Sequence, residues 1–193
     1  FGTSGSGKST LLNQISGMEK PTEGNVWIGN VNITKLKEEQ IAAFRQKHIG
    51  FIFQTYNLLP YMTALENTAL PLMFQGYGRG EREKRAASLL KKVGLAERMY
   101  HYPSQMSGGQ QQRVGIARAF AANPEVIFAD EPTGNLDTKT TAQIMEMMME
   151  IARKKNQTIV LVTHDPQMAA YADRILTLID GNIIKEQRRE ERE

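Results

Sequence analysis

The first residues that could do chemistry are the small and polar ones near the start, "GTSGSGKST". Gly2, Gly7, Lys8 and Ser9 fit the pattern GxxxxGK(S/T), in which glycines let backbone N–H groups converge on an anion, lysine reaches the terminal phosphates and the hydroxyl coordinates magnesium. A flexible glycine-serine leader is the alternative, but the pattern arises by accident in only about one chain of this size in a hundred. We therefore predict a site for a nucleoside triphosphate, a property that kinases, GTPases, helicases and transport ATPases share.

Two carboxylates follow an apolar run in "VIFADE", at Asp130 and Glu131. A strand there would end at the edge where open α/β sheets bind ligands. Adjacent strand residues point to opposite sides, so the two acids are expected to do different jobs. The arrangement that satisfies the chemistry has Asp130 facing the magnesium held by Ser9, and Glu131 facing the water that attacks the γ-phosphate.

Two further polar residues are expected at the same edge. The apolar stretch "TIVLVT" leads to His164, whose imidazole could donate to the γ-phosphate or orient the water. Gln54 follows "IGFIF", and its amide could reach magnesium or water and relay that state to the helical segment that comes next.

A second anion-binding cap is predicted by "MSGGQQQRVGIARA". Ser107, Gly108 and Gly109 would expose backbone and hydroxyl donors at the start of a helix, about a hundred residues after the first cap. One bound ATP already has its phosphate loop, so two such caps in one chain suggest a dimer.

The composition of the chain limits the class of protein to which it can belong. The chain has 193 residues, 40% of them hydrophobic, no cysteine and a net charge of +3. Its length suits one domain, and zero cysteines exclude a disulfide framework or a thiolate metal site. No apolar run approaches the roughly 18 residues that a membrane span needs, and a cytoplasmic protein is expected. The charges are interspersed, so we favour a solvated surface and expect no nucleic-acid partner.

The pattern of apolar residues predicts an α/β fold. Short strands around Gly29-Asn30 precede a helical stretch over residues 55–107, and the second half alternates helices with nearly continuous apolar strands, as in a buried parallel sheet. Trp27 is expected in the core. The segment "IMEMMMEI" is expected to bury one stripe through Ile144, Met147, Met148 and Ile151. The charged tail "KEQRREERE" is interpreted as a fraying helix end.

Together these motifs resemble the nucleotide-binding subunit of ABC transporters, from Gly2 to about Lys185. "GTSGSGKST" is similar to the Walker A motif, Gln54 to the Q-loop, "SGGQQQR" to the signature, "VIFADE" to Walker B, "GNLD" to the D-loop and His164 to the switch histidine. The resemblance implies catalytic roles for Glu131, His164 and Gln54, and magnesium ligation by Ser9, Gln54 and Asp130. The implied nucleotide-binding residues are Ser4, Gly5, Ser6, Gly7, Lys8, Ser9, Thr10, Ser107, Gly108, Gly109 and Gln110. The implied dimer contacts in the D-loop are Asn135, Leu136 and Asp137.

The resemblance also implies a fold and partners. We expect a P-loop NTPase with a mostly parallel central sheet, one domain over residues 1–193 and a helical subdomain at about 55–112 within it. ATP with Mg²⁺ would lie in a sandwich homodimer, or in a pair of ATPase domains, between the phosphate loop of one copy and the signature cap of the other. A membrane permease, separate or fused, would hold the protein at the inner face of the cell membrane.

Within the family, "IGFIFQTYNLLPYMTALEN" and "DEPTGNLD" are most similar to the branch with LolD, MacB and FtsE. That branch implies lipoprotein release, macrolide or peptide export, or an FtsE-like regulation of cell-wall hydrolases. A chromosome or DNA-repair ATPase would need long coiled coils between the Walker motifs, and no sustained heptads occur there. A translation factor of the same type would need two cassettes.

The chain departs from the family pattern at its start, where only Phe1 precedes Gly2. Family members carry further strands and an adenine-stacking aromatic residue before the Walker A motif. We therefore expect an N-terminally truncated fragment that folds poorly and binds ATP weakly by itself, and the adenine-stacking residue cannot be named.

Overall fold

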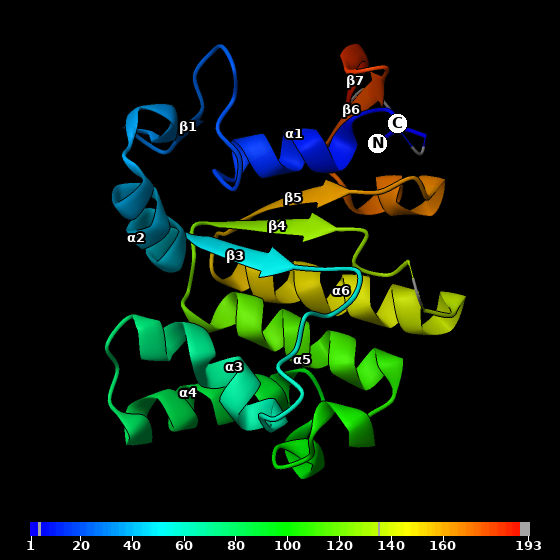
Figure 1. The fold of residues 1–193 in the computed structure, drawn as a ribbon. Helices are drawn as coiled ribbons and strands as arrows, with labels where there is room; N and C mark the ends of the chain where they lie inside the picture. The colour runs from blue at the N-terminus through cyan, green and yellow to red at the C-terminus, as the bar shows by residue number, and fades with distance from the viewer. Residues whose placement is uncertain (4, 135, 190–193) are drawn as a thin grey trace. The chain divides into compact units, whose positions relative to one another are not determined.

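The computed structural model describes residues 1–3, 5–134 and 136–189. Contacts within the chain divide it into two compact units, which we call unit 1 (Phe1–Ile41 with Leu161–Glu193) and unit 2 (Ala42–Val160). Each unit is built around its own elements (Figure 1). The division of the domain that the sequence predicts, with a helical subdomain at 55–112, stays a prediction.

Unit 1 combines one helix with two small antiparallel sheets. Its elements are α1 (Lys8–Ile15), β1 (Trp27–Ile28), β2 (Val31–Asn32), the 3₁₀ helices η1 (Ile33–Lys35) and η4 (Pro166–Tyr171), β6 (Arg174–Ile179) and β7 (Asn182–Arg188). Strand β1 pairs with β2, and β6 with β7. Helix α2 (Glu38–His48) and strand β5 (Thr158–Val162) each begin in one unit and end in the other.

The hairpin of β6 and β7 corrects the interpretation of the charged tail. Asp180 and Gly181 connect the strands with φ angles of 46° and 77°, as a two-residue hairpin turn requires. Residues 185–188 pair with β6 as a strand, so the predicted helix end is wrong there. The physical reason is cross-strand pairing, because the turn brings Arg174 within 2.8 Å of Glu186 and the ladder satisfies the backbone.

Trp27 is also placed differently from its prediction. Its side chain is 62% exposed, whereas the neighbouring Ile28 is 8% exposed. Side chains alternate between the two faces of a strand, and in this two-residue strand the inward position belongs to Ile28. Periodicity predicts that one of the two is buried but does not say which.

Unit 2 contains most of the three-stranded sheet and most of the described helices. Its elements are β3 (Ile49–Ile52), α3 (Ala64–Phe74), α4 (Arg79–Lys92), the 3₁₀ helices η2 (Ala96–Arg98) and η3 (Pro103–Gln105), α5 (Gly108–Ala121), β4 (Val126–Asp130) and α6 (Thr138–Lys154). The sheet has the order β3-β4-β5, and β3 runs parallel to β4. The predicted α/β class with a parallel sheet is confirmed.

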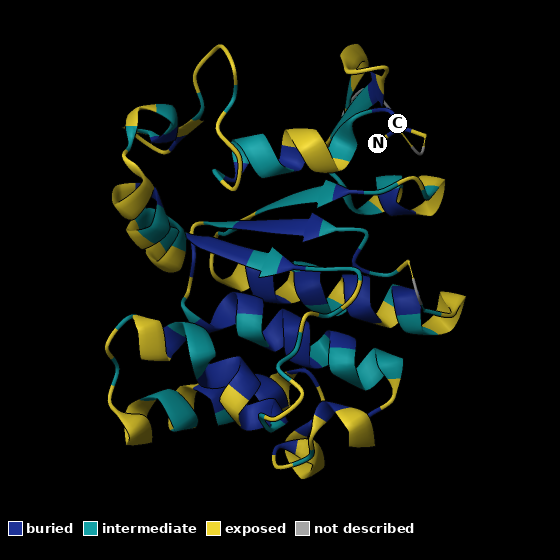
Figure 2. Ribbon diagram, in the orientation of Figure 1, coloured by how far each residue is buried: buried dark blue, intermediate teal, exposed yellow. Residues whose placement is uncertain are grey.

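Helix α5 lies at the centre of unit 2. It contacts strand β3 and the helices α3, α4 and α6, and Figure 1 shows α5 and α6 on the same side of the sheet. Figure 2 shows that most of β3 and β4 and the inner faces of these helices are buried, whereas most of β5 is only half-buried. In α6 the buried stripe includes Ile144, Met145, Met148 and Ile151, whereas Met147 is only half-buried. A rigid α5 at this position can hold groups at both the strand ends and its own N-terminus.

Candidate functional site

The phosphate loop is formed in unit 1 at the start of α1. Gly7 is the N-cap of this helix and has a φ of 75°, a left-handed conformation that only glycine adopts at little cost. No side chain caps α1 and its first turn holds no acidic residue. The N-termini of α3, α5 and α6, in contrast, are capped by the side chains of Thr63, Ser107 and Asp137. Helix α4 also lacks a side-chain cap, but its first turn holds the acidic Glu81. The N-terminus of α1 therefore suits an anion in place of a capping side chain.

Internal hydrogen bonds hold this loop. The Nζ atom of Lys8 donates to the carbonyl oxygen of Thr3 over 3.0 Å, and the buried hydroxyl of Ser6 donates to the same oxygen over 2.8 Å. The Gly181 N–H donates to the Ser6 carbonyl, which attaches the loop to the β6–β7 turn. Gly5, Ser9 and Thr10 are exposed, and Ser4 lies outside the described residues. The loop thus presents Lys8 and exposed backbone at one helix end.

The backbone before the loop is also held in unit 1. The amino group of Phe1 donates to the Leu176 carbonyl over 2.9 Å, and the Leu178 N–H donates to the Phe1 carbonyl over 2.7 Å. Phe1 therefore pairs with β6 in the manner of a parallel strand residue.

His164 lies two residues after β5 and is exposed. The next residue, Asp165, caps η4 by accepting the Gln167 N–H over 2.9 Å. His164 is therefore exposed between a strand end and a capped helical turn, and its catalytic role stays a prediction.

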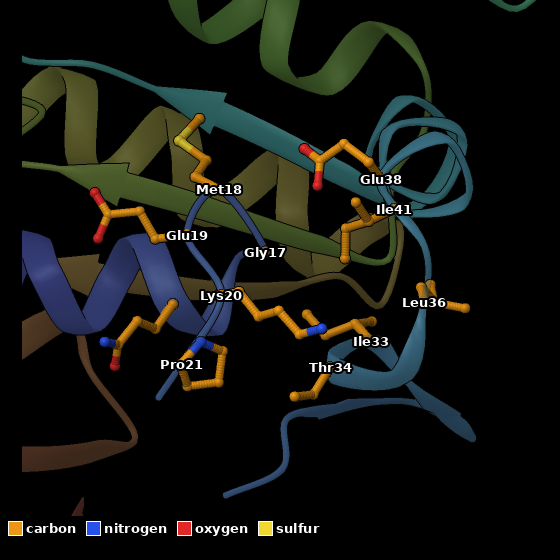
Figure 3. Close-up of a pocket in the computed structure, with 11 residues that line it drawn as sticks. Gly17, Met18, Glu19, Lys20, Pro21, Ile33, Thr34, Leu36, Glu38 and Ile41 are labelled. Carbon is orange, nitrogen blue, oxygen red and sulfur yellow. The ribbon is translucent and has the colours of Figure 1, made fainter. Parts of the chain in front are cut away.

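A small hollow in unit 1 offers no room for a nucleotide. Figure 3 shows its lining residues, which come from the end of α1 and the loop after it, from η1 and from the start of α2. Its volume is about 50 Å³, which suits one or two water molecules.

In unit 2 the two predicted carboxylates lie at the end of β4, as the sequence indicates. Asp130 is the last residue of the strand, and both acids are half-buried. Glu131 has a φ of 43°, a left-handed conformation that is unusual for a residue with a side chain. The Gly134 N–H donates to the Glu131 carbonyl over 3.1 Å and closes a turn over residues 131–134, which we call the Glu131 turn. Local strain of this kind is concentrated at functional sites.

Gln54 lies beside the Glu131 turn. Strand β3 ends at Ile52, so Gln54 lies two residues beyond the strand. A β-carbon placed on Gly134 would stand 2.8 Å from the amide nitrogen of Gln54. The structure therefore brings Gln54 and the turn after β4 together, which the sequence predicts for the ends of parallel strands.

The signature segment forms the predicted cap of α5. The Ser107 hydroxyl accepts the Gln110 N–H over 3.3 Å, and the Gln110 side chain accepts the Ser107 N–H over 3.0 Å. Gly108 and Gly109 start the helix. Ser107 keeps a hydroxyl hydrogen to donate, whereas the side-chain oxygen of Gln110 is used within the cap.

Residues that the sequence analysis did not single out position this cap. A β-carbon on Gly108 would stand 2.8 Å from the phenol oxygen of Tyr56, so Tyr56 lies against the start of α5. Arg118, further along α5, donates to the carbonyls of Tyr56 and Asn57, which both have positive φ angles. A signal was available, since Arg118 is a charged residue within the apolar stretch "GIARAF".

The D-loop residues have separate positions. Asp137 is the N-cap of α6 and accepts the N–H and hydroxyl of Thr140 over 3.0 and 2.6 Å. These bonds lower the pKa of Asp137, the hydroxyl bond most. The Leu136 N–H donates to the Thr133 carbonyl, and Asn135 lies outside the described residues.

The predicted site residues thus fall into two groups. The phosphate loop and His164 belong to unit 1, and Gln54, the α5 cap, the Glu131 turn and Asp137 belong to unit 2. Within residues 1–3, 5–134 and 136–189, no three His, Asp or Glu side chains converge as a metal site of protein ligands alone. Magnesium at nucleotides needs only one or two protein ligands, because phosphate and water supply the others.

The profile of the ABC transporter family matches residues 1–134, more than half of the chain. The chain belongs to this family. The family predicted from the motifs is therefore confirmed, and with it a cassette of the ATP-binding type.

Three ABC proteins illustrate the similarity of this chain to its relatives. The ABC transporter ATP-binding protein MJ0796 of Methanocaldococcus jannaschii, described as uncharacterized, is 49% identical over 97% of this chain and 82% of its own length. The lipoprotein-releasing system ATP-binding protein LolD of Legionella pneumophila is 45% identical over 95% of this chain and 81% of its own. The macrolide export ATP-binding/permease protein MacB of Bartonella henselae is 48% identical over 95% of this chain, which spans 28% of MacB.

Two solved structures of MJ0796 are similar to this ABC cassette, each with a TM-score of 0.89 over 97% of this chain and 82% of the other. One, at 46% identity, is a dimer in a post-hydrolysis state bound to ADP and Pi. The other, at 47% identity, is also dimeric.

Proposed function

We propose that this ABC cassette binds and hydrolyses ATP as a homodimer, in which each nucleotide lies between the phosphate loop of one copy and the α5 cap of the other. The observation that carries the proposal is the N-terminus of α1, which has a left-handed Gly7, Lys8 beside it and no capping side chain. Such an end suits a phosphate. The ADP and Pi bound by dimeric MJ0796 support the two-copy arrangement.

The residues have distinct roles in this proposal. Lys8 and the backbone of residues 5–10 hold the phosphates, and Ser107 with Gly108 and Gly109 contacts the nucleotide of the other copy. Glu131 accepts the proton of the attacking water, while His164 and Gln54 orient that water. Ser4 and Gln110 belong with the residues proposed to bind nucleotide. Asn135, Leu136 and Asp137 support the interface between the copies in this proposal.

The residues present fit a magnesium ion. Asp130 at the end of β4 offers a carboxylate, and the Ser9 hydroxyl and the Gln54 amide are the other protein oxygens that would hold it. When bound, Mg²⁺ neutralises charge on the phosphate oxygens.

We further propose that ATP turnover powers a membrane permease and that the cassette acts at the inner face of the cell membrane through it. The similarity to LolD and MacB supports this partner. In the described part of the chain, no helix has both the length and the apolar character needed to cross a bilayer.

The decisive experiment replaces the proposed base. Glu131→Gln keeps the shape of the side chain but removes the proton acceptor, so ATP binding should persist while kcat falls by about 100-fold or more. Binding is measured by equilibrium dialysis with ATP, and turnover by phosphate release. The exposed Glu146→Gln on α6 is the matched control and should leave both unchanged. Hydrolysis by Glu131→Gln within twofold of the parent would contradict the assignment.

A further inference from the structure

Two glutamine amides make the same kind of contact at opposite ends of strand β4, one from the buried Gln112 and one from the half-buried Gln157. The Nε2 of Gln112, on α5, donates to the carbonyl of Pro132, just after the strand. The Nε2 of Gln157 donates to the carbonyl of Pro124, just before the strand, over 2.6 Å. Both prolines are buried. The two contacts differ in which end of β4 they hold and in their burial, which is complete only at Gln112.

Both glutamines also leave an atom unsatisfied. Among the described residues, the buried Oε1 atoms of Gln112 and Gln157 have no hydrogen-bond partner. A buried acceptor without a partner costs stability, and an apolar side chain of similar shape would avoid that cost. Gln112 is completely buried, so stability alone does not account for an amide at this position.

The Gln112 contact falls on the Glu131 turn. Pro132 directly follows Glu131, whose left-handed backbone must be held by its surroundings. Gln54 lies against the same turn at Gly134. Gln112 also follows Gly108 by four residues and so shares its face of α5. One side chain thus connects the helix that starts at the signature cap with the peptide that follows Glu131.

We propose that Gln112 is a positioning residue for Glu131. By holding the Pro132 carbonyl, its amide fixes the peptide plane after Glu131 and with it the direction of the carboxylate. The contact also couples the direction of the Glu131 carboxylate to the position of the α5 cap. When the α5 cap of one copy closes on the nucleotide held by its partner, Glu131 of the first copy is aligned with the nucleotide in its own phosphate loop. The proposal rests on the proposed role of Glu131 in ATP hydrolysis.

The test compares Gln112→Met with the matched control Gln157→Met. Each removes an amide bond to a proline carbonyl and an unpartnered oxygen, so the two melting temperatures should change by similar, small amounts. Only Gln112→Met should release the Glu131 turn, which raises the hydrogen exchange rate of the Gly134 amide about tenfold, as measured by NMR. Only Gln112→Met should lower kcat, by about 10- to 100-fold, with an unchanged KM for ATP.

A second variant separates positioning from packing. Gln112→Glu keeps the side-chain shape, and its protonated carboxyl can donate to Pro132 while its carboxylate cannot. Burial raises the pKa of such a carboxyl, so the kcat of this variant relative to the parent should fall as pH rises. A pH-independent ratio would contradict the proposal.

Further outcomes would overturn the proposal. They are an unchanged Gly134 exchange rate in Gln112→Met, an equal increase in Gln157→Met, and a loss of kcat that only follows a loss of folded protein. If the parent protein does not hydrolyse ATP, the proposed function fails, whereas the exchange of Gly134 still decides whether Gln112 holds the turn.

Discussion

Arg118 holds Tyr56 by the backbone: its Nη2 donates to the Tyr56 carbonyl over 2.8 Å, and its Nη1 donates to the next carbonyl, that of Asn57. The two acceptors belong to consecutive residues in left-handed conformations, two and three positions after Gln54. The planar guanidinium matches two neighbouring oxygens in a way that a point charge does not. Burial lowers the pKa of Arg118. The bond to Tyr56 is part-buried and the bond to Asn57 is exposed. The segment after Gln54 is therefore fixed to α5.

The first prediction is that Arg118→Met destabilises the protein by about 3 kcal/mol, because two carbonyls lose charged donors. The free energy of unfolding is measured in urea. Arg82→Met is the control, since Arg82 makes one longer bond of 3.3 Å to the Tyr77 carbonyl. That control should cost about 1 kcal/mol or less. An equal loss of unfolding free energy in the two variants would mean that the two hydrogen bonds of Arg118 stabilise the protein no more than an ordinary surface contact does.

Local signals in the sequence predict much of this structure. The glycine pattern predicts the phosphate loop and the start of α1, and the run "VIFAD" coincides with β4 at Val126–Asp130. The Asp-Gly pair predicts the turn at residues 180–181. In each case the determinants lie within a few residues of one another, because glycine conformation, helix caps and apolar runs are properties of short segments.

Contacts between distant segments could not be predicted in the same way. Arg118 and Tyr56 are 62 positions apart, and Gln112 and Pro132 are 20 apart. No spacing rule connects them, since each pairing depends on how α5 packs in unit 2. Trp27 illustrates the same limit in a strand, because only the packing of unit 1 decides which side of β1 is buried.

The second prediction concerns pH and the N-cap of α6. The folded pKa of Asp137 lies below its usual value of 3.8, so its contribution to stability is present above that value and is lost as pH falls through the folded pKa. Asp137→Ala should lower the melting temperature by about 2 to 4 °C at pH 7. The difference in melting temperature between Asp137→Ala and the parent should disappear when the pH falls below the folded pKa of Asp137. Asp137→Asn retains a capping oxygen and should melt close to the parent; a deficit as large as that of alanine would exclude capping as the cause.

The third prediction is that nucleotide binding depends on the phosphate loop and not on the small hollow in Figure 3, which provides the control residue. Lys8→Ala should weaken ATP binding by about 10- to 100-fold, because a charged donor to phosphate is lost. Lys20 lines the hollow and is exposed, so Lys20→Ala should bind ATP within twofold of the parent. Isothermal titration with ATP measures both. A loss of affinity in Lys8→Ala no larger than that in Lys20→Ala would contradict the assignment of the phosphate loop.

The fourth prediction tests whether the α5 cap acts on the nucleotide of the other copy. Ser107→Arg removes the capping hydroxyl of α5 and fills the space before the helix, while Lys8→Ala disables the phosphate loop. Neither variant alone can form a complete site in a symmetric dimer. A mixed dimer contains one site with an intact loop from the first variant and an intact cap from the second.

Random mixing makes about half of the dimers mixed, with one complete site in each, so phosphate release should recover to about a quarter of the parent rate. If each cap served the loop of its own chain, every site in the mixture would carry a damaged half, and no recovery would appear. Strong coupling between the two sites could suppress turnover even in a correct mixed dimer. ATP-dependent dimerisation, followed by light scattering on the same mixture, removes this ambiguity because it needs closure and not turnover. Mixed dimers that neither form with ATP nor release phosphate would refute the two-copy sandwich, whereas dimers that form without turnover would place the defect in the coupling of the sites.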